Sequence, residues 1–178
     1  MGDYREERWH RHLGVYGICI QEGKLLLIHK KGGPYINRYD LPGGTVEPNE
    51  PLVTALHREV KEETGLKINV IRNLGVRDYV TPYPLEKRGT THIHHIAVFY
   101  EMDYVSGEPS FCTEMHDNDS AGPEWVDPNG VTQENSSPLV WQALEWLKDR
   151  NHNHLEVARL DDWMVMEAKE GIDCDAGN

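Results

Sequence analysis

The segment that most constrains this chain runs over residues 44–66 and reads GTVEPNEPLVTALHREVKEETGL. Its apolar residues recur at helical spacing: Leu52, Val53, Leu56 and Val60. This period predicts an amphipathic helix with one buried stripe. Asn49-Glu50-Pro51 supplies a cap-type residue, an acid and an early proline for its start, and Gly65 is expected to end it. Such a helix needs another layer to cover its apolar stripe.

The polar face of this helix carries Glu59, Glu62 and Glu63. Residues at i, i+3 and i+4 fall within roughly 100° of one another on a helix. Carboxylates this close repel each other, and hard oxygen ligands on adjacent turns suit Mg²⁺ or Mn²⁺. The alternative is a solvated acidic face paired with Arg58 and Lys61, and for an isolated RExxEE pattern that alternative is favoured.

The flanking sequence predicts a mixed sheet covered by helices, an α+β architecture. Strands are expected at 12–20, 24–30, 67–76, 91–105 and 125–126, the first two joined as a hairpin through Gln21-Glu22-Gly23. Residues 108–122 are expected to form a loop. Ser137-Pro138 opens a second helix, and 163–166 reads as either a strand or a helix.

The composition limits the classes of partner. The formal net charge of −12 over 178 residues argues against binding a nucleic-acid backbone, which favours a basic surface. A protein with this net negative charge that binds phosphate groups needs local positive charge, and bound divalent cations are its natural source. No apolar run is long enough for a membrane span, and no secretory signal is visible. Three cysteines without a C-x-x-C pair are typical of reduced thiols, so a cytoplasmic location is expected.

The 44–66 segment resembles the Nudix box, G-x5-E-x7-R-E-U-x-E-E-x-G-U with U aliphatic, at every defined position. These positions are Gly44, Glu50, Arg58, Glu59, Val60, Glu62, Glu63, Gly65 and Leu66. The resemblance outweighs the solvated-face alternative and implies an α/β/α sandwich with a central mixed β-sheet. It extends loosely over residues 12–150. Residues 1–11 are then an N-terminal extension, and 151–178 are a C-terminal segment packed on, or trailing from, the same domain.

The resemblance to Nudix enzymes implies a hydrolase that cleaves a pyrophosphate bond in a nucleoside diphosphate linked to another moiety. By motif position, Glu59, Glu62 and Glu63 would hold Mg²⁺, for which Mn²⁺ may substitute, together with the backbone at Gly43. Arg58 would pair with Glu50 and hold the glutamates in place. One box glutamate, or an acid outside the box, would orient the attacking water. The outside candidates are Glu114, Asp117, Asp119 and Glu124.

Substrate contacts are expected outside the acidic cluster. The turn at Gly44 would let the backbone approach the phosphates. Tyr39 or Tyr35 could stack on a nucleobase, and Arg38, Lys30 or Lys31 could meet phosphates. An equally weighted alternative is that these residues are half-buried loop aromatics and solvated basic side chains with no role in binding. In Thr91-His92-Ile93-His94-His95, His92 and His94 share one face of a strand and His95 takes the other. His94 is predicted to contact substrate.

Two further functions stay open on the sequence. An isopentenyl-diphosphate isomerase shares the fold but usually has a degenerate box and a catalytic cysteine, and no recognisable motif surrounds Cys19 or Cys112. A nucleotide or ADP-ribose sensor would commonly lose box glutamates, which are all present here. The expected partner is a small nucleotide-type molecule, with no membrane or nucleic-acid partner and with a homodimer left open. The sequence does not choose the nucleoside-diphosphate derivative.

Overall fold

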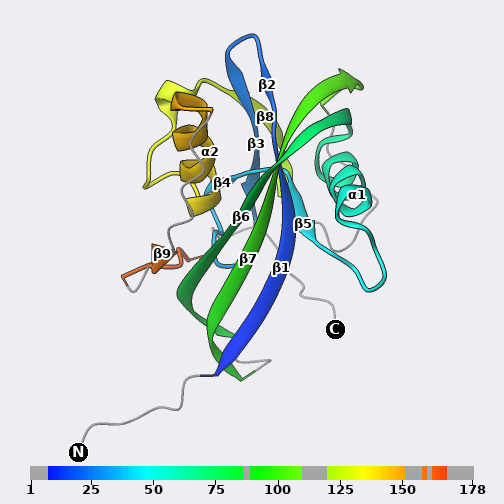
Figure 1. Cartoon of the computed structure of the whole chain (residues 1–178). Helices are drawn as coiled ribbons and strands as arrows, with labels where there is room; N and C mark the ends of the chain where they lie inside the picture. The colour runs from blue at the N-terminus through cyan, green and yellow to red at the C-terminus, as the bar shows by residue number, and fades with distance from the viewer. Residues whose placement is uncertain (1–7, 86–88, 110–119, 151–157, 160–161, 168–178) are drawn as a thin grey trace, which may run out of the picture.

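The computed structural model describes residues 8–85, 89–109, 120–150, 158–159 and 162–167. Two packed sheets lie between two helices (Figure 1). The strands are β1 (Trp9–Ile18), β2 (Ile20–Gln21), β3 (Lys24–Lys30), β4 (Tyr39–Asp40), β5 (Gly43–Thr45), β6 (Lys67–Leu85), β7 (Thr90–Ser106), β8 (Ser120–Val126) and β9 (Ala158–Arg159). The helices are α1 (Leu52–Thr64) and α2 (Pro138–Lys148), with a 3₁₀ turn, η2, at Pro128–Gly130.

The larger sheet is mixed, as the sequence predicted. Its strand order is β5-β1-β7-β6-β9, with β1 parallel to β7 and β6 antiparallel to β7. The smaller sheet has the order β2-β3-β4, and β8 also pairs with β3. The two helices flank these sheets from opposite sides (Figure 1). The predicted α+β sandwich is therefore confirmed, with its strands divided between two sheets.

The core divides into two clusters because successive side chains of a strand point to opposite faces. Leu26 of β3 joins Val15, Val98 and the buried stripe of α1. The neighbouring side chains of β3 join the second cluster with α2. That cluster includes Tyr16, Leu25, Leu27, Phe99, Leu139, Val140 and Trp146. Each helix thus covers its own core, and the strands between them contribute to both.

The predicted hairpin between 12–20 and 24–30 is wrong in its extent. The chain changes sheet at Cys19: β1 pairs with β5 and β7, whereas β2 pairs with β3. The turn itself is as expected, with positive φ at Glu22 (51°) and Gly23 (78°). A two-residue turn fixes only the local pairing, so the sheet that each half of the run joins is decided by tertiary packing.

The start of α1 also differs from the prediction. The helix begins at Leu52 with Pro51 at its N-cap, and no side chain caps it. Asn49, the expected cap, has φ 64° and lies outside the helix. Glu50 also precedes the helix, where its carboxylate accepts a hydrogen bond from the backbone N–H of Glu47. Gly65 ends the helix in a left-handed conformation, as predicted, and its N–H donates to the Lys61 carbonyl.

Several strands extend beyond their predicted bounds. Both β6 and β7 are longer than predicted, and Ser120–Gly122, assigned to a loop, belong to β8. Trp9–Arg11, assigned to an N-terminal extension, pair with His92–His94 in β7.

Ser137 caps α2 as expected, accepting a hydrogen bond from the Val140 N–H. Residues 163–167 form neither strand nor helix, although Trp163 packs against the α2-side cluster. Among the described residues, no helix has the length and apolarity to cross a membrane.

Candidate active site

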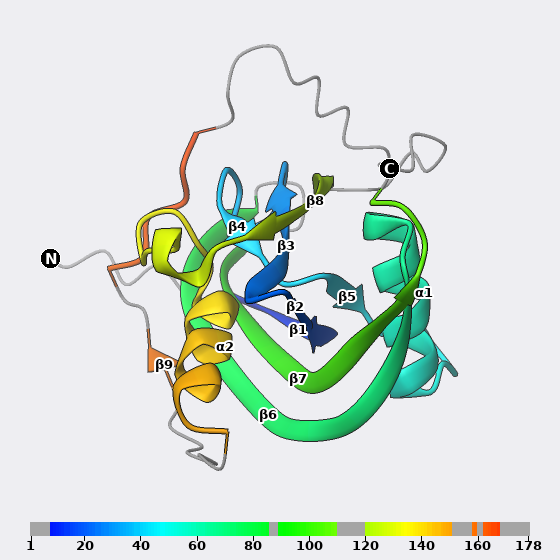
Figure 2. The same ribbon diagram turned by 90° about the horizontal axis from the view of Figure 1, so that it is seen from above.

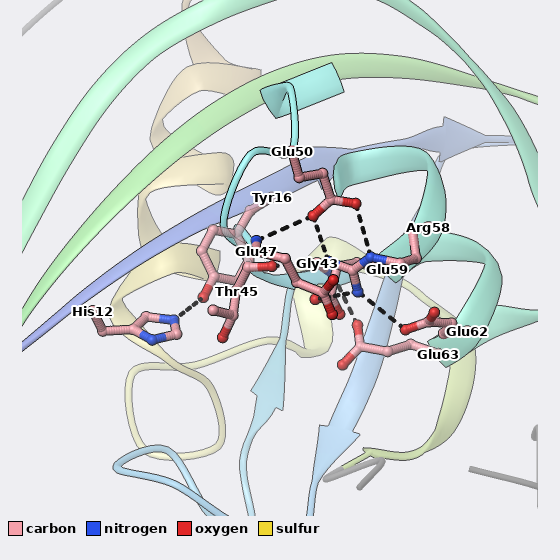
Figure 3. Close-up of polar contacts among 10 residues, drawn as sticks. All are labelled: His12, Tyr16, Gly43, Thr45, Glu47, Glu50, Arg58, Glu59, Glu62 and Glu63. Atoms are coloured by element: carbon pink, nitrogen blue, oxygen red, sulfur yellow. Dashed lines mark hydrogen bonds and ion pairs between the residues drawn. The ribbon is translucent and has the colours of Figure 1, made fainter. Parts of the chain in front are cut away.

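Arg58 gathers carboxylates from α1 and from the loop that precedes it (Figure 3). Its Nε and Nη2 donate to the two carboxylate oxygens of Glu50 at 2.9 and 2.8 Å. Its Nη1 donates to Glu59 at 2.9 Å and to Glu62 at 3.2 Å. Nη2 also reaches the carbonyl of Thr45 at 3.0 Å, which ties α1 to β5. One guanidinium therefore fixes three carboxylates relative to the strand that leads into the helix.

Glu63 is held separately and lies deeper. Its side chain accepts a hydrogen bond from the backbone N–H of Gly43 at 2.8 Å, and the residue is 4% exposed. The preceding glycine turn lies against the same cluster. A Cβ at Gly44 would lie 2.6 Å from a carboxylate oxygen of Glu59, and one at Gly43 would lie 2.1 Å from the Val15 carbonyl. The strand can approach the glutamates this closely because neither position carries a side chain.

The electrostatics of the cluster divide its acids into two kinds. Burial raises the pKa of Glu59, while Arg58 and, more weakly, Lys30 oppose that shift. The hydrogen bonds from Arg58 lower the pKa of Glu50. The same pairing raises the pKa of Arg58, which therefore stays charged. Glu50 thus acts as the fixed counter-charge of the arginine, and Glu59 is a partly desolvated carboxylate that gains from a further cation.

The donor set of this cluster suits a hard divalent cation. Glu59, Glu62 and Glu63 offer carboxylate oxygens from neighbouring turns of one helix, which is the ligand chemistry that Mg²⁺ and Mn²⁺ prefer. Within the described ranges, no group of three His, Cys, Asp or Glu side chains stands in ligating geometry. Arg58 Nη1 contacts both Glu59 and Glu62, so in this structure the guanidinium balances their charge.

Other predicted site residues lie around the neighbouring loop. The hydroxyl of Tyr39 donates to Glu124 at 3.0 Å, and its ring packs on His29 at 4.2 Å between centroids. Glu124 is thereby placed beside β4 rather than in the Arg58 network. Glu114, Asp117 and Asp119 lie outside the described residues. Arg38 is buried, at 7% exposure, and stacks on Trp163 with 4.1 Å from its Cζ to the ring centroid.

His94, predicted to contact substrate, lies away from the carboxylate cluster. His94 pairs with Asp78 at 2.8 Å and stands four residues from Val98, which lies across β1 from Gly44. That separation is about 13 Å along a strand, so the structure does not bring His94 together with the glutamates.

His95, which the sequence analysis did not select, lies between the sheets. It contacts the Tyr16 hydroxyl through Nε2 at 2.9 Å and the Tyr35 hydroxyl through Nδ1 at 3.1 Å. Burial holds the pKa of His95 well below its usual value, so the ring is neutral. The strand alternation already placed His95 on the other face, but it could not show that this face is the covered one.

A pocket of about 620 Å³ lies elsewhere, between α2, η2 and the β2–β3 turn. None of the predicted site residues lines it. The carboxylate cluster and its glycine turn therefore lie outside this pocket.

An α+β sandwich that presents this glutamate helix beside a double-glycine turn defines the Nudix class of protein. A sequence model of the NUDIX domain matches residues 9–148, so the chain belongs to the Nudix family. The predicted family is confirmed.

Similar proteins include an ADP-ribose pyrophosphatase of Methanocaldococcus jannaschii, 38% identical over 60% of each chain. The match therefore spans about three-fifths of that protein's own length. An oxidized purine nucleoside triphosphate hydrolase of Danio rerio is 27% identical over 75% of this chain and 78% of its own. A MutT NUDIX hydrolase structure from Burkholderia pseudomallei is 28% identical, with a TM-score of 0.57 over 76% of this chain and 97% of that one. The chain is thus similar to proteins that are named as hydrolases and pyrophosphatases.

Proposed function

We propose that this chain is a hydrolase that cleaves a pyrophosphate bond in a nucleoside diphosphate linked to another moiety. The reaction is attack of a metal-activated water on phosphorus. Nudix enzymes generally use divalent metal ions, and Mg²⁺ is the ion proposed here, with Mn²⁺ as a substitute. The cytoplasmic location stays a prediction. The homodimer, which the sequence left open, stays open.

The observation that supports the proposal most directly is that the Arg58 guanidinium forms ion pairs with Glu50, Glu59 and Glu62 together. Carboxylates on one face of a helix repel each other, and a fold that served stability alone would gain by replacing some of them. In this chain the carboxylates are present together, Arg58 orients them, and they lie beside the Gly43-Gly44 turn. Such an arrangement suits phosphoryl transfer, which depends on charge neutralisation and on positioning of the nucleophile.

Each residue has a separate role in this proposal. Glu59, Glu62 and Glu63 would hold the metal with the Gly43 backbone, and Arg58 with Glu50 would fix their orientation. A bound divalent ion would supply charge neutralisation at the phosphates and would lower the pKa of water. The Gly43 N–H already orients Glu63 at 2.8 Å. Since Gly44 has no side chain, phosphate oxygens can approach the strand without a steric barrier.

The relatives suggest two substrate classes without choosing between them. The Methanocaldococcus protein is named for ADP-ribose and the Danio protein for oxidized purine nucleoside triphosphates. Both names describe compounds with a pyrophosphate bond next to a nucleoside. A sensor with little turnover is less well supported because the four carboxylates in contact with Arg58 or Gly43 are all present and ordered. An isomerase is less well supported because Cys19 is buried in the α1-side core. Cys112, the other cysteine considered for that reaction, lies outside the described residues.

A substrate panel tests the proposal. ADP-ribose, nucleoside triphosphates, nucleotide sugars and dinucleoside polyphosphates are incubated with the full chain and Mg²⁺ or Mn²⁺, and released monophosphate or phosphate is measured. Reaction in ¹⁸O-labelled water should place the label on a phosphate product. Glu59→Gln serves as the inactive reference, and Glu145→Gln, at an exposed position on α2, serves as the matched control. Turnover no higher than that of the Glu59→Gln protein across the whole panel would refute the hydrolase assignment.

A further inference from the structure

Arg38 is a buried cation with unused donors. Its Nη2 donates to the Met164 carbonyl at 3.1 Å. Nε and Nη1 are also buried, and neither has an acceptor within the part of the chain that the structure describes. Burial lowers the pKa of Arg38, because desolvation disfavours the charged guanidinium. Buried guanidinium donors normally find acceptors, so this arrangement favours a ligand that supplies them.

The surroundings hold Arg38 rigidly. The carbonyl of Arg38 accepts from the Lys30 N–H at 3.0 Å, and the Arg38 N–H donates to the Tyr35 carbonyl at 3.2 Å. On the side-chain face lies Trp163, whose Nε1 donates to the Pro34 carbonyl at 2.9 Å. The end of the described chain therefore lies over this loop, beside β4 (Figure 2). Trp163 fixes the plane of the guanidinium and shields one of its faces from water.

A path of contacts joins this position to the glutamate cluster. Trp163 packs edge-on against Tyr35 with centroids 5.7 Å apart, and Tyr35 contacts His95, which contacts Tyr16. Tyr16 pairs with Gly43, whose N–H binds Glu63. Along the chain, Arg38 precedes Gly43 by five residues, so their Cα atoms lie at most about 17 Å apart. The two positions therefore lie within the length of one nucleotide-sized molecule.

We propose that Arg38, backed by Trp163, is a subsite for oxygen acceptors on the part of the substrate beyond the cleaved diphosphate. Nε and Nη1 donate to those oxygens, and Trp163 is the positioning residue that orients the guanidinium. The acceptors are keto oxygens of a nucleobase or phosphate oxygens of the terminal moiety, and both satisfy the same donors. The subsite rests on the proposed function, because that function places the diphosphate at α1.

Binding of products that contain no pyrophosphate bond tests the subsite without turnover. The full chain is titrated with GMP, AMP, ribose 5-phosphate and inorganic phosphate by calorimetry. A keto-oxygen site binds GMP at least about tenfold more tightly than AMP. A phosphate site binds AMP, GMP and ribose 5-phosphate alike. In either case Arg38→Gln weakens the binding by about tenfold or more, Trp163→Ala weakens it, and Trp163→Phe retains most of it.

Arg72→Gln is the matched control, since Arg72 also lies over a tryptophan ring, Trp146, with 5.8 Å between its Cζ and the centroid. It should bind the probes as the wild type does. If Arg38→Gln does not fold, Arg38→Lys, which keeps the charge but not the planar donors, takes its place.

A purely structural contact between Arg38 and the chain end would give a different result. It predicts a lower melting temperature for Arg38→Gln with unchanged probe affinity, and that outcome overturns the proposal, as does the absence of binding of every probe to the wild type. Arg38-dependent binding in a chain that hydrolyses nothing would count against the proposed function alone. Hydrolysis with an unchanged KM in Arg38→Gln would overturn the subsite alone.

Discussion

Arg58 and Glu50 form a two-point ion pair, with Nε to Oε1 at 2.9 Å and Nη2 to Oε2 at 2.8 Å. The parallel geometry uses one edge of the guanidinium fully and leaves Nη1 for the glutamates of the helix. Glu50 thus sets the angle at which Arg58 meets Glu59 and Glu62. The pairing expected from the sequence motif is present, and it links a loop residue to the helix face that carries the proposed chemistry.

Replacing Arg58 by lysine should therefore impair activity more than folding. A lysine keeps the charge but cannot donate along two parallel directions, so the orientation of Glu59 and Glu62 is lost. We expect kcat to fall by about 10- to 100-fold, the range typical of residues that orient metal ligands. Steady-state kinetics and circular dichroism of Arg58→Lys measure the two effects, with Arg72→Lys as the control. A kcat equal to that of the wild type would show that this orientation is unimportant.

The two glycines before α1 should respond differently to alanine. At Gly44 the added methyl group meets the flexible end of Glu59 at 2.6 Å, and the backbone conformation is ordinary. The fold should survive while Glu59 moves, and kcat should fall by about tenfold or more, since displacements near 1 Å can cost about 100-fold.

At Gly43 the methyl group meets the Val15 backbone carbonyl at 2.1 Å, with φ at +143°. Neither can yield, so Gly43→Ala should lose about 2 kcal/mol or more of unfolding free energy. Thermal melts and kinetics on both variants test the contrast. Equal losses of stability at the two positions would contradict it.

Glu62→Gln should leave the protein folded and nearly inactive. The amide keeps the size of the side chain but removes one negative charge from the proposed metal site, so kcat should drop by at least about 100-fold. Chelation with EDTA should abolish wild-type activity, and Mg²⁺ or Mn²⁺ should restore it. The Glu145→Gln control should keep wild-type kinetics. Wild-type turnover in the Glu62→Gln protein would refute its assignment as a ligand.

His95 should make stability depend on pH. Its pKa in the folded state lies well below 6.5, whereas the unfolded chain titrates near 6.5. Between those values the unfolded state binds more protons, so stability is full above about pH 6.5 and decreases as the pH falls below it. The slope is on the order of 1 kcal/mol per pH unit.

Melting curves between pH 7.5 and pH 5 measure this dependence. His95→Gln, which does not titrate, should show a shallower slope than the wild type, and His57→Gln, at an exposed position on α1, should match the wild type. An unchanged slope in His95→Gln would mean that other groups dominate the acid sensitivity.

Local sequence predicted the elements near the site well. Leu56 and Val60 are buried on α1 as their spacing predicted, and Gly65 ended the helix as expected. Val53, assigned to the same stripe, is 42% exposed, so that part of the prediction was wrong. The start of α1 was less predictable because Asn49 competes with Pro51 for the capping position, and the positive φ of Asn49 removes it from the helix. Which residue takes the N-cap position depends on where the strand before the helix ends and on the direction in which the chain leaves it.

The histidines show a different kind of limit. The alternation of β7 predicted that His94 and His95 face opposite ways, which the structure shows. Which face is covered depends on the second sheet, and residues distant in sequence, Tyr16 and Tyr35, build the surroundings of His95. Trp163 is a similar case, because its contact with Arg38 joins positions far apart along the chain.

By itself, the sequence determined the family, the glutamate helix and the carboxylates that we propose as metal ligands, because these depend on periodicity and spacing within a short segment. The tertiary structure decided which strands share a sheet, that Arg58 contacts Glu50, Glu59 and Glu62 together, and that Arg38 is buried beneath Trp163. The physical reason is that burial and long-range pairing are properties of packed layers. A residue's distance along the chain does not fix its distance in space.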